Sequence, residues 1–263
     1  MSGRTIEIER SGAVAWIWMN RPEVHNAFDP VMIAELTEAF VLLGASADVR
    51  VIVLAGRGKS FSAGADAEWM RQQGAASIEE NTADARRLAT LFHTLYELPK
   101  PTVARVQGVA IGGGLGLVAA CDIAIASEAA QCATSEVRLG LIPATIAPYV
   151  VRAIGERHAR ALFQTGERID AATGHRIGLL HAVAPADQLD EQVQRAIESL
   201  LRGAPEAQCA AKQLVDTVTN RPITAELIEE TVRQIASRRA SSEAREGLDA
   251  FLEKRSPAWS TPR

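Results

Sequence analysis

Short apolar runs of strand length alternate with helix-compatible segments through the first half of the chain. Val51–Ala55 is β-branched and uncharged, Val103–Val109 is a further run that Arg105 and Gln107 interrupt, and Ile123–Ala126 follows. Uncharged strands of this kind are typical of parallel sheets that helices cover on both faces. Their alternation with helices predicts an α/β fold with mainly parallel strands.

The flanking regions extend this prediction. Val14–Met19 reads as an earlier strand, and Asp29-Pro30 suits the start of a helix, with Asp as the N-cap and Pro at the first helical position. After Ala186 only helical periodicity remains. We therefore expect a core over residues 1–200 and a helical region over 201–263.

Composition excludes several classes of protein. The chain has 263 residues, 47% of them apolar, and a net charge of −4 from 28 basic and 32 acidic residues. This balance argues against nucleic acid as a partner. Three cysteines without a CxxC pair favour a reducing compartment. No segment has the length of a signal peptide core or a membrane span. We expect a soluble cytoplasmic protein without a membrane partner.

Familiar ligand motifs fail on their spacing. Gly58-Lys59-Ser60 resembles the end of a phosphate-binding P-loop, but the required earlier glycine is Val53. Gly114-x-Gly116-x-x-Ala119 fits a loose dinucleotide pattern, yet the next strand leaves room for only about two helical turns. The histidines show no metal-ligand spacing, so no metal is expected.

Two loops share one design. Phe61–Asp66 and Ile111–Gly116 each run from a strand end through small residues into a helix start. A helix N-terminus presents unpaired N–H groups and a partial positive charge. Two such loops side by side could direct two amides at one oxygen and form an oxyanion hole. Glycine serves tight packing of strands and helices equally well, so both interpretations stand on spacing alone.

Several sequence motifs together resemble the crotonase (enoyl-CoA hydratase/isomerase) superfamily. The matching motifs span most of the chain: Asn20-Arg21-Pro22 with Asn26-Ala27, Phe61–Asp66, Lys100-Pro101 through Gly108, Gly112–Gly114, Cys121-Asp122, Glu136–Pro143, Thr165-Gly166-Glu167, Gly178-Leu179, and Phe251–Arg255 with Trp259.

This resemblance implies a spiral of strand–strand–helix turns and a C-terminal helical region that forms trimers, often paired into hexamers. It implies an acyl-CoA thioester as the substrate and no cofactor beyond the coenzyme A of that substrate. The thioester oxygen would lie between the backbone N–H groups of Ala65 and Gly113, which match the family's two oxyanion donors.

The family pattern also identifies the catalytic acid. Hydratases of the family commonly use two glutamates. The position of the first is Gly116 here, whereas the second matches Glu136. Without the resemblance, Glu136 would read as a surface carboxylate paired with Arg138. With it, Glu136 alone either handles water and the α-proton or shuttles a proton in a double-bond isomerase.

The segment Ile142–Arg152 lacks the usual glycine run of the family. It is similar to the bacterial methylglutaconyl-CoA hydratase group and to the related carboxygeranoyl-CoA type. This favours hydration of a branched, carboxylated or otherwise methylglutaconyl-like enoyl-CoA. An isomerase, and a non-catalytic relative that binds coenzyme A or RNA, remain as alternatives.

Further site residues follow from the resemblance. Asp66 is expected to cap a helix, and Asp122 receives no role. Trp69, Met70 and Tyr149 would line the acyl pocket by analogy, although ordinary core packing is the stronger explanation for any one of them. The coenzyme A contacts would come from His25, Ala27, Ala63, Asp66, Phe251 and Lys254, the last two often from a neighbouring subunit.

Overall fold

The computed structural model describes residues 5–260 of the protein. Residues 1–4 and 261–263, which belong to the predicted segments 1–200 and 201–263, lie outside the described residues. The division between those two segments stays a prediction.

The larger of two sheets has the strand order β1-β2-β3-β4-β6-β9. The first two strands form an antiparallel hairpin, and every other neighbouring pair is parallel. The predicted α/β class with mainly parallel strands is therefore confirmed. The strands are β1 (Ile6–Ser11), β2 (Val14–Met19), β3 (Val51–Gly56), β4 (Thr102–Val106), β6 (Ile123–Ser127) and β9 (Ala182–Ala184).

The helices begin where the sequence supplies caps. Asp29 accepts a hydrogen bond from the N–H of Met32 at the start of the first helix, and Asp66 caps the second by accepting from two backbone N–H groups. The helices are α1 (Pro30–Ala45), α2 (Ala67–Gly74), α3 (Ile78–Tyr96), α4 (Gly113–Ala120), α5 (Ala147–Thr165), α6 (Ala171–Arg176), α7 (Leu189–Arg202), α8 (Pro205–Val218), α9 (Ala225–Arg239) and α10 (Ser242–Leu252).

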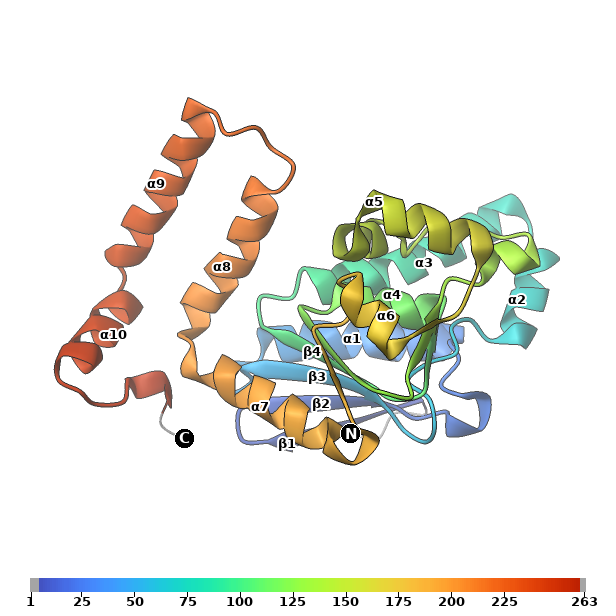
Figure 1. The fold of residues 1–263 in the computed structure, drawn as a ribbon, viewed down its shortest axis with the longest axis horizontal. Helices are drawn as coiled ribbons and strands as arrows, with labels where there is room; N and C mark the ends of the chain where they lie inside the picture. Colours follow the sequence, from blue (N-terminus) through green and yellow to red (C-terminus); the bar gives the residue numbers. More distant parts are fainter. Residues whose placement is uncertain (1–4, 261–263) are drawn as a thin grey trace.

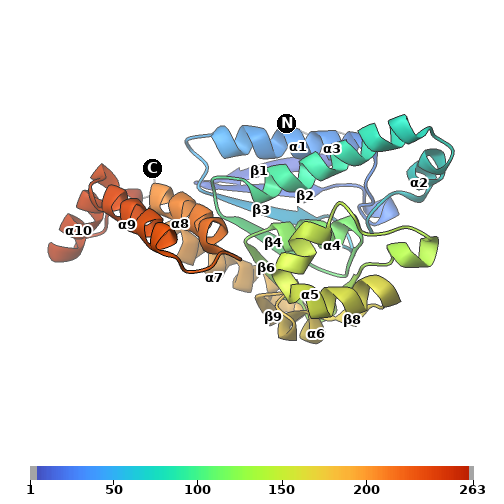
Figure 2. The same cartoon turned by 90° about the horizontal axis from the view of Figure 1, so that it is seen from above.

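Both faces of β3 are buried, which explains its unbroken apolar sequence. Ile52 and Leu54 belong to the main core, where α1 and α3 cover the sheet. Val51 and Val53 belong to a second, smaller core, which α7 covers. Figure 2 shows α1 and α3 on one side of the sheet and α7 toward the other. The sheet is thus the middle layer of three.

The predicted strand Val103–Val109 is wrong as one element. It is two strands, β4 and β5 (Val109–Ile111), and β5 joins the small sheet with β7 (Gln131–Ala133) and β8 (Ile169–Asp170). The chain turns at Gly108, which has φ +59° and where a Cβ would lie 2.0 Å from the carbonyl oxygen of Lys59. Only glycine fits this turn.

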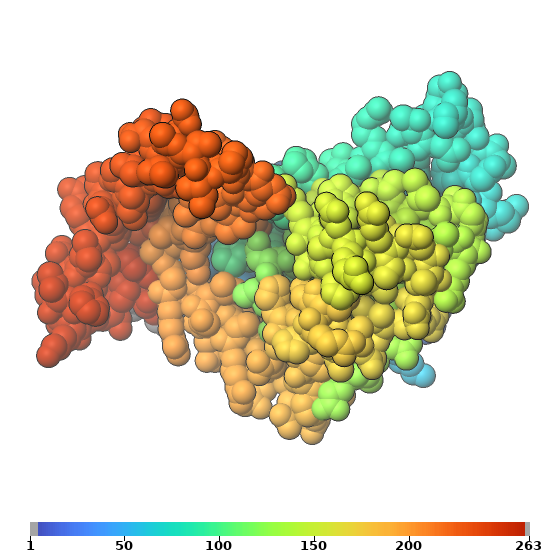
Figure 3. All heavy atoms as spheres, turned by 45° about the horizontal axis from the view of Figure 1, so that its top comes forward, coloured from blue at the N-terminus to red at the C-terminus, as the bar shows by residue number. Residues whose placement is uncertain are grey.

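The C-terminal helices α8, α9 and α10 extend to one side of the sheet (Figure 1) and form a distinct lobe in the space-filling view (Figure 3). Polar contacts of Lys212 and Asp216 join α8 to the body. Lys212 lies 3.0 Å from Asp122, which also accepts from the N–H and hydroxyl of Thr102. Asp216 accepts from the hydroxyl of Tyr96. Asp122 therefore has a structural role that the sequence did not reveal.

Candidate active site

The first of the two predicted loops, Phe61–Asp66, and the turn that precedes it are held by a buried asparagine. Asn26 has a left-handed backbone with φ 56° and no exposed surface. Its side-chain amide donates to the carbonyl oxygens of Arg57 and Ser60 at 2.9 and 2.8 Å. The backbone carbonyl of Asn26 accepts from the hydroxyl of Ser62. These bonds fix the loop on a rigid support.

Phe28 fixes the end of this loop. Its N–H donates to the carbonyl of Gly64 at 2.6 Å, and its carbonyl accepts from the N–H of Asp66 at 2.8 Å. Ala65 lies between these two anchors, and its N–H donates to no backbone acceptor within residues 5–260. An unused amide at a fixed position results.

The second loop presents a similar amide. Gly112, with φ +52°, donates its N–H to the carbonyl of Ala133 at 2.9 Å and precedes α4. Gly113 is the first residue of this helix, so its N–H has no acceptor inside the helix. The partial positive charge of the helix N-terminus adds to the attraction for a negative oxygen.

The two loops lie against each other. The backbone N–H of Ser62 donates to the carbonyl of Val109, and the backbone carbonyl of Ser62 accepts from the N–H of Ile111, each at 3.0 Å. A Cβ at Gly64 would lie 2.6 Å from the carbonyl oxygen of Ile111 and 3.4 Å from the nitrogen of Gly113. The glycine therefore permits the contact that brings the amides of Ala65 and Gly113 to one cavity.

This cavity has a volume of about 520 Å³, and most of its wall is apolar. No lysine, arginine or histidine is among the lining residues that the structure describes. The wall includes Phe28, Ala63, Gly64, Ala65, Trp69, Met70, Gln73, Ile78, Asn81, Asp84, Ala85, Leu88, Ile111, Gly112, Gly113, Glu136, Leu139, Leu141, Ile142, Thr145 and Ile146.

Glu136 enters the cavity beside the second loop. It begins the 3₁₀-helix Glu136–Leu139, and its Oε1 atom would lie 3.1 Å from a Cβ at Gly112. Its Oε2 atom is buried and has no hydrogen-bond partner among residues 5–260. Arg138 turns away and donates to the carbonyl of Thr165. Glu136 is therefore not the paired surface carboxylate of the alternative interpretation.

Burial raises the pKa of the Glu136 carboxyl above its ordinary value of 4.5, and only the backbone N–H of the same residue opposes the shift. A carboxyl with a raised pKa is suited to accept and return a proton near neutral pH.

Ile146 occupies the space that a first glutamate would need. A Cβ at Gly116 would lie 2.2 Å from Ile146 Cγ2 and 3.0 Å from Phe92 Cε1. Glu68, another acid near the first loop, is exposed and pairs with Arg71 at 2.6 Å. The only carboxylates among the described lining residues are therefore Glu136 and Asp84.

The structure separates the predicted acyl-pocket residues. Trp69 and Met70 line the cavity. Tyr149 does not; its ring packs against Phe92 at 6.0 Å and Tyr96 at 5.5 Å, in the layer behind the wall. The prediction that Tyr149 lines the acyl pocket is corrected, because α5 directs this ring toward α3.

The predicted coenzyme A contacts are dispersed in the single chain. His25 is exposed and lies 3.0 Å from the hydroxyl of Ser60, and its carbonyl accepts from the N–H of Ala63. Ala27 is buried beside it. Phe251 and Lys254 lie at α10, at the far side of the molecule from α2 (Figure 1). Any contact from them to the cavity has to come from another subunit.

Asp66 combines two contacts. Besides capping α2, its carboxylate lies 3.1 Å from the guanidinium of Arg21. The same guanidinium donates to the carbonyl of Ala27 at 2.7 Å. Asp66 therefore joins the predicted coenzyme A region to the first loop.

Sequence reasoning missed several cavity residues. Asp84 shares a helix face with the core residues Leu88, Leu91, Phe92 and Leu95, at spacings of four, seven, eight and eleven residues. An acid on an apolar helix face is a visible signal. Nothing in the sequence indicated the place of Ile146, since it depends on how α5 meets α4.

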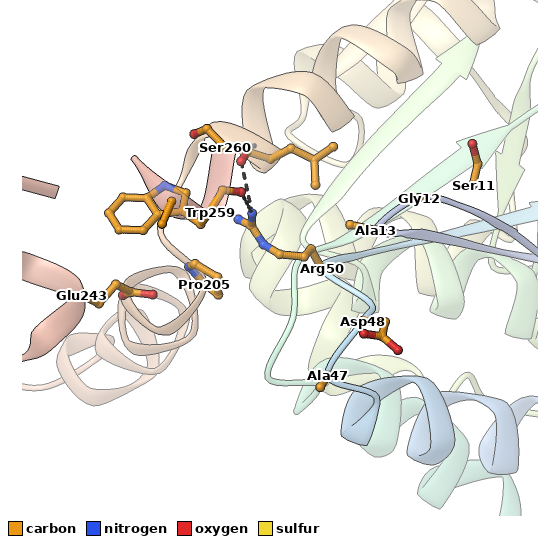
Figure 4. Close-up of a pocket in the computed structure, with 12 residues that line it drawn as sticks. Ser11, Gly12, Ala13, Ala47, Asp48, Arg50, Pro205, Glu243, Trp259 and Ser260 are labelled. Atoms are coloured by element: carbon orange, nitrogen blue, oxygen red, sulfur yellow. Dashed lines mark hydrogen bonds between the residues drawn. The ribbon is translucent and has the colours of Figure 1, made fainter. Parts of the chain in front are cut away.

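A second cavity of about 710 Å³ lies between the sheet edge and the C-terminal segment (Figure 4). The one arginine among its described lining residues, Arg50, donates to the backbone carbonyls of Leu201, Gly203 and Trp259. Burial lowers the pKa of Arg50, and the nearby Glu243 opposes the shift. Because Arg50 is occupied by main-chain acceptors, this cavity is a structural junction.

No helix within residues 5–260 combines the length and the apolar composition that crossing a bilayer needs. In the same range, no three His, Cys, Asp or Glu side chains are grouped to hold a metal ion.

The geometry suits one kind of reaction. Two fixed amides can stabilise a carbonyl oxygen that becomes negative, and a carboxyl of raised pKa in the same cavity can move a proton. The arrangement therefore fits enolate chemistry next to a carbonyl.

Comparisons with known proteins agree with this chemistry. The sequence model of the enoyl-CoA hydratase/isomerase family matches residues 9–262. A Rhizobium meliloti protein with the name "Probable enoyl-CoA hydratase" is 36% identical over 256 residues, which cover 97% of each chain.

Solved structures are similar over the same length. That of an enoyl-CoA hydratase from Shewanella pealeana has 42% identity and a TM-score of 0.95, covering 97% of this chain and 96% of its own. That of an enoyl-CoA hydratase/isomerase from Marinobacter aquaeolei has 33% identity and a TM-score of 0.92, covering 98% and 99%.

Proposed function

Because this chain belongs to the enoyl-CoA hydratase/isomerase family, with its crotonase fold, we propose that it adds water across the 2,3 double bond of an enoyl-CoA. The observation that carries the proposal is the buried carboxyl of Glu136 next to two unused amides in one cavity. Family membership makes it an enzyme, so the non-catalytic alternative is not retained.

In the proposed reaction the thioester oxygen accepts hydrogen bonds from the N–H groups of Ala65 and Gly113. The Glu136 carboxylate removes a proton from water as the water oxygen bonds to the β-carbon. The electrons of the double bond move onto the thioester oxygen as an enolate. Glu136 then returns the proton to the α-carbon, so both additions occur on one face of the double bond.

Isomerisation is the second candidate, because Gly116 and Ile146 leave one carboxyl near the oxyanion loops. In that reaction Glu136 would remove a proton from one carbon of a 3-enoyl-CoA and return it two carbons away. Both reactions share the enolate, and they differ in whether water enters the product.

A branched enoyl-CoA is the proposed substrate, from the resemblance of residues 142–152. A carboxylated, methylglutaconyl-like enoyl-CoA has the same sequence support. The described cavity wall, however, has no lysine, arginine or histidine to pair with a carboxylate on the acyl group. No cofactor is needed beyond the coenzyme A that the substrate carries.

We also propose a homotrimer, or a dimer of trimers. Ile228, Val232 and Ile235 lie on one face of α9 and are about half exposed, and Phe251 on α10 is 79% exposed. Apolar faces of this extent favour contact with another copy. In such an assembly Phe251 and Lys254 would reach the coenzyme A of a neighbouring subunit. The three free cysteines support a cytoplasmic location.

The test is Glu136→Gln against a panel of straight, branched and dicarboxylic enoyl-CoAs, with products identified by mass spectrometry. Loss of a general acid/base should lower turnover by about 10²–10⁴-fold. Substrate binding should persist, because glutamine has the same shape. Undiminished turnover would reject the role of Glu136.

The same panel separates the two reactions. A product heavier by one water indicates hydration, whereas a 3-enoyl-CoA converted to a 2-enoyl-CoA of equal mass indicates isomerisation. The matched control is Glu79→Gln, a surface carboxyl of α3 that does not line the cavity.

A further inference from the structure

A buried carboxylate lies in the cavity wall away from the oxyanion loops. Asp84 is only 7% exposed and lines the cavity from α3. Its Oδ1 accepts from Arg87 at 2.7 Å. Its Oδ2 has no hydrogen-bond partner among residues 5–260. This oxygen also keeps some accessible surface, unlike the unpartnered atoms that are fully buried. This oxygen is therefore an unused acceptor that a ligand can reach.

The position of Asp84 places it at the end of the cavity remote from the reaction. Phe92 packs at Gly116, one turn of α4 beyond the oxyanion loop. Asp84 is eight residues earlier on α3, about 12 Å along the helix axis. Asp84 thus cannot replace the missing first glutamate. It is placed to meet the far end of an acyl chain.

Other polar atoms of this end are also unused. Trp69 Nε1 and Gln73 Oε1, one turn apart on α2, are both buried without a hydrogen-bond partner in the described chain. Asn81 uses its amide to hold the α2–α3 corner, donating to the carbonyls of Gln73 and Ala76. Buried polar groups normally find partners. The lack of partners for these two atoms indicates that a bound molecule supplies the missing hydrogen bonds.

From this arrangement, and resting on the proposed function, we propose that the preferred enoyl-CoA carries an uncharged hydrogen-bond donor, a hydroxyl, at the far end of its acyl chain. The hydroxyl donates to Asp84 Oδ2. Asp84 is then a specificity-determining residue of the acyl pocket.

Charge argues against an anionic acyl end. Arg87 is the one cation in contact with Asp84, and the Asp84 carboxylate already neutralises it at 2.7 Å. A second carboxylate would be buried next to a like charge without a cation in the described wall. A hydroxyl avoids that repulsion and satisfies the unused acceptor.

The test compares 2-enoyl-CoAs in matched pairs that differ by a terminal hydroxyl, from hexenoyl to dodecenoyl. In the wild type, kcat/KM should favour the hydroxylated member by about 10- to 100-fold at the chain length that reaches Asp84. Asp84→Leu should remove the preference, and the dicarboxylic analogue should be the poorest substrate of the wild type.

For each variant, activity on the enoyl-CoA without the terminal hydroxyl shows whether the protein is folded. The isosteric variant Asp84→Asn is used if the Asp84→Leu protein does not fold. In Asp84→Asn the preference should shrink and the dicarboxylic compound should improve. Glu79→Gln should keep the wild-type ratio. Equal kcat/KM within every pair, or a preference that survives Asp84→Leu, would overturn the inference and leave the proposed function intact. Failure of the wild type to convert any of these compounds, or any branched or 3-enoyl compound of the earlier panel, would overturn both.

Discussion

In the proposed mechanism Glu136 moves the proton, because its carboxyl is buried in the cavity and one of its oxygens has no partner in the described chain. Oε2 has no partner among residues 5–260, and burial raises its pKa. Unpartnered burial of this kind destabilises the folded state, and proteins commonly accept such a loss at functional sites. Stability and catalysis therefore oppose each other at this residue.

We predict that Glu136→Gln increases the free energy of unfolding at neutral pH. A raised pKa means that the folded protein binds this proton more readily than the unfolded chain does. Wild-type stability therefore falls as the pH rises from about 4.5 through the raised pKa. The difference in the free energy of unfolding between Glu136→Gln and the wild type should vanish below pH 4.5. Urea denaturation across this range measures it.

The control is again Glu79→Gln, which should change the free energy of unfolding by no more than about 0.5 kcal/mol, because Glu79 is exposed. The same pKa should appear in catalysis, with kcat/KM of the wild type decreasing as Glu136 becomes protonated. An equal free energy of unfolding for wild type and Glu136→Gln at neutral pH would contradict this interpretation.

Gly116 is the second decisive residue. Its lack of a side chain lets Ile146 fill the wall, so the single-carboxyl site is part of the packed core. Gly116→Ala should lower the free energy of unfolding by about 1–3 kcal/mol, because overpacking outweighs the helix propensity gained from alanine.

Gly74→Ala is the matched control for this prediction, since a Cβ there meets nothing within 4 Å. It should leave stability unchanged or raise it slightly. Urea denaturation of both variants decides. If Gly116→Ala and Gly74→Ala change the free energy of unfolding by the same amount, the close contact of Gly116 with Ile146 does not affect stability.

The sequence was informative at this scale where local spacing decides the structure. The small residues before each helix start predicted both loops, and Asp66 was predicted as a cap. Tyr149 was misplaced and Ile146 was missed, because both depend on the rotation of α5 against its neighbours, and helical periodicity does not define that rotation.

At the scale of elements, α8 is joined to the body by charged groups more than by apolar packing. None of its side chains is fully buried. Lys212 and Asp216 supply its contacts to Asp122 and Tyr96. Burial, together with the Asp216 carboxylate, raises the pKa of Tyr96 to about 12, so this contact persists through ordinary pH.

We predict that Lys212→Met loosens α8 without unfolding the sheet. The lost charged hydrogen bond should lower local stability by about 1–3 kcal/mol. Hydrogen exchange should increase in α8 and stay unchanged in β3. Arg195→Gln, which breaks an exposed ion pair on α7, is the control and should have an effect under about 1 kcal/mol. Equal protection of α8 in both variants would contradict the role of Lys212.

The strands at Val14–Met19, Val51–Ala55 and Ile123–Ala126 and the helix start at Asp29-Pro30 followed from the sequence, because apolar runs and caps are local signals. The break between β4 and β5 did not. It depends on the approach of the Lys59 carbonyl to Gly108, a contact between segments almost fifty residues apart.

At the scale of the whole molecule, the fold brings together segments that are distant in sequence. The loop after β3 pairs with β5 through Ser62, and β7 also pairs with β5 just before the chain reaches Glu136. The site exists only where all three meet. Neither spacing nor composition could have shown that contact, although the family resemblance anticipated it.

The most direct test of this account removes one amide. Ala65→Pro deletes the proposed oxyanion donor. Ala67→Pro is the control, because position 67 begins α2, its N–H is unused within the described chain, and the preceding Asp66 has the extended backbone that proline requires.

The measurement is kcat/KM on the best enoyl-CoA of the panel for both variants. We expect Ala65→Pro to lose about 10²–10³-fold relative to the wild type, and Ala67→Pro to stay within a factor of about two. Wild-type turnover by a folded Ala65→Pro protein would contradict the account.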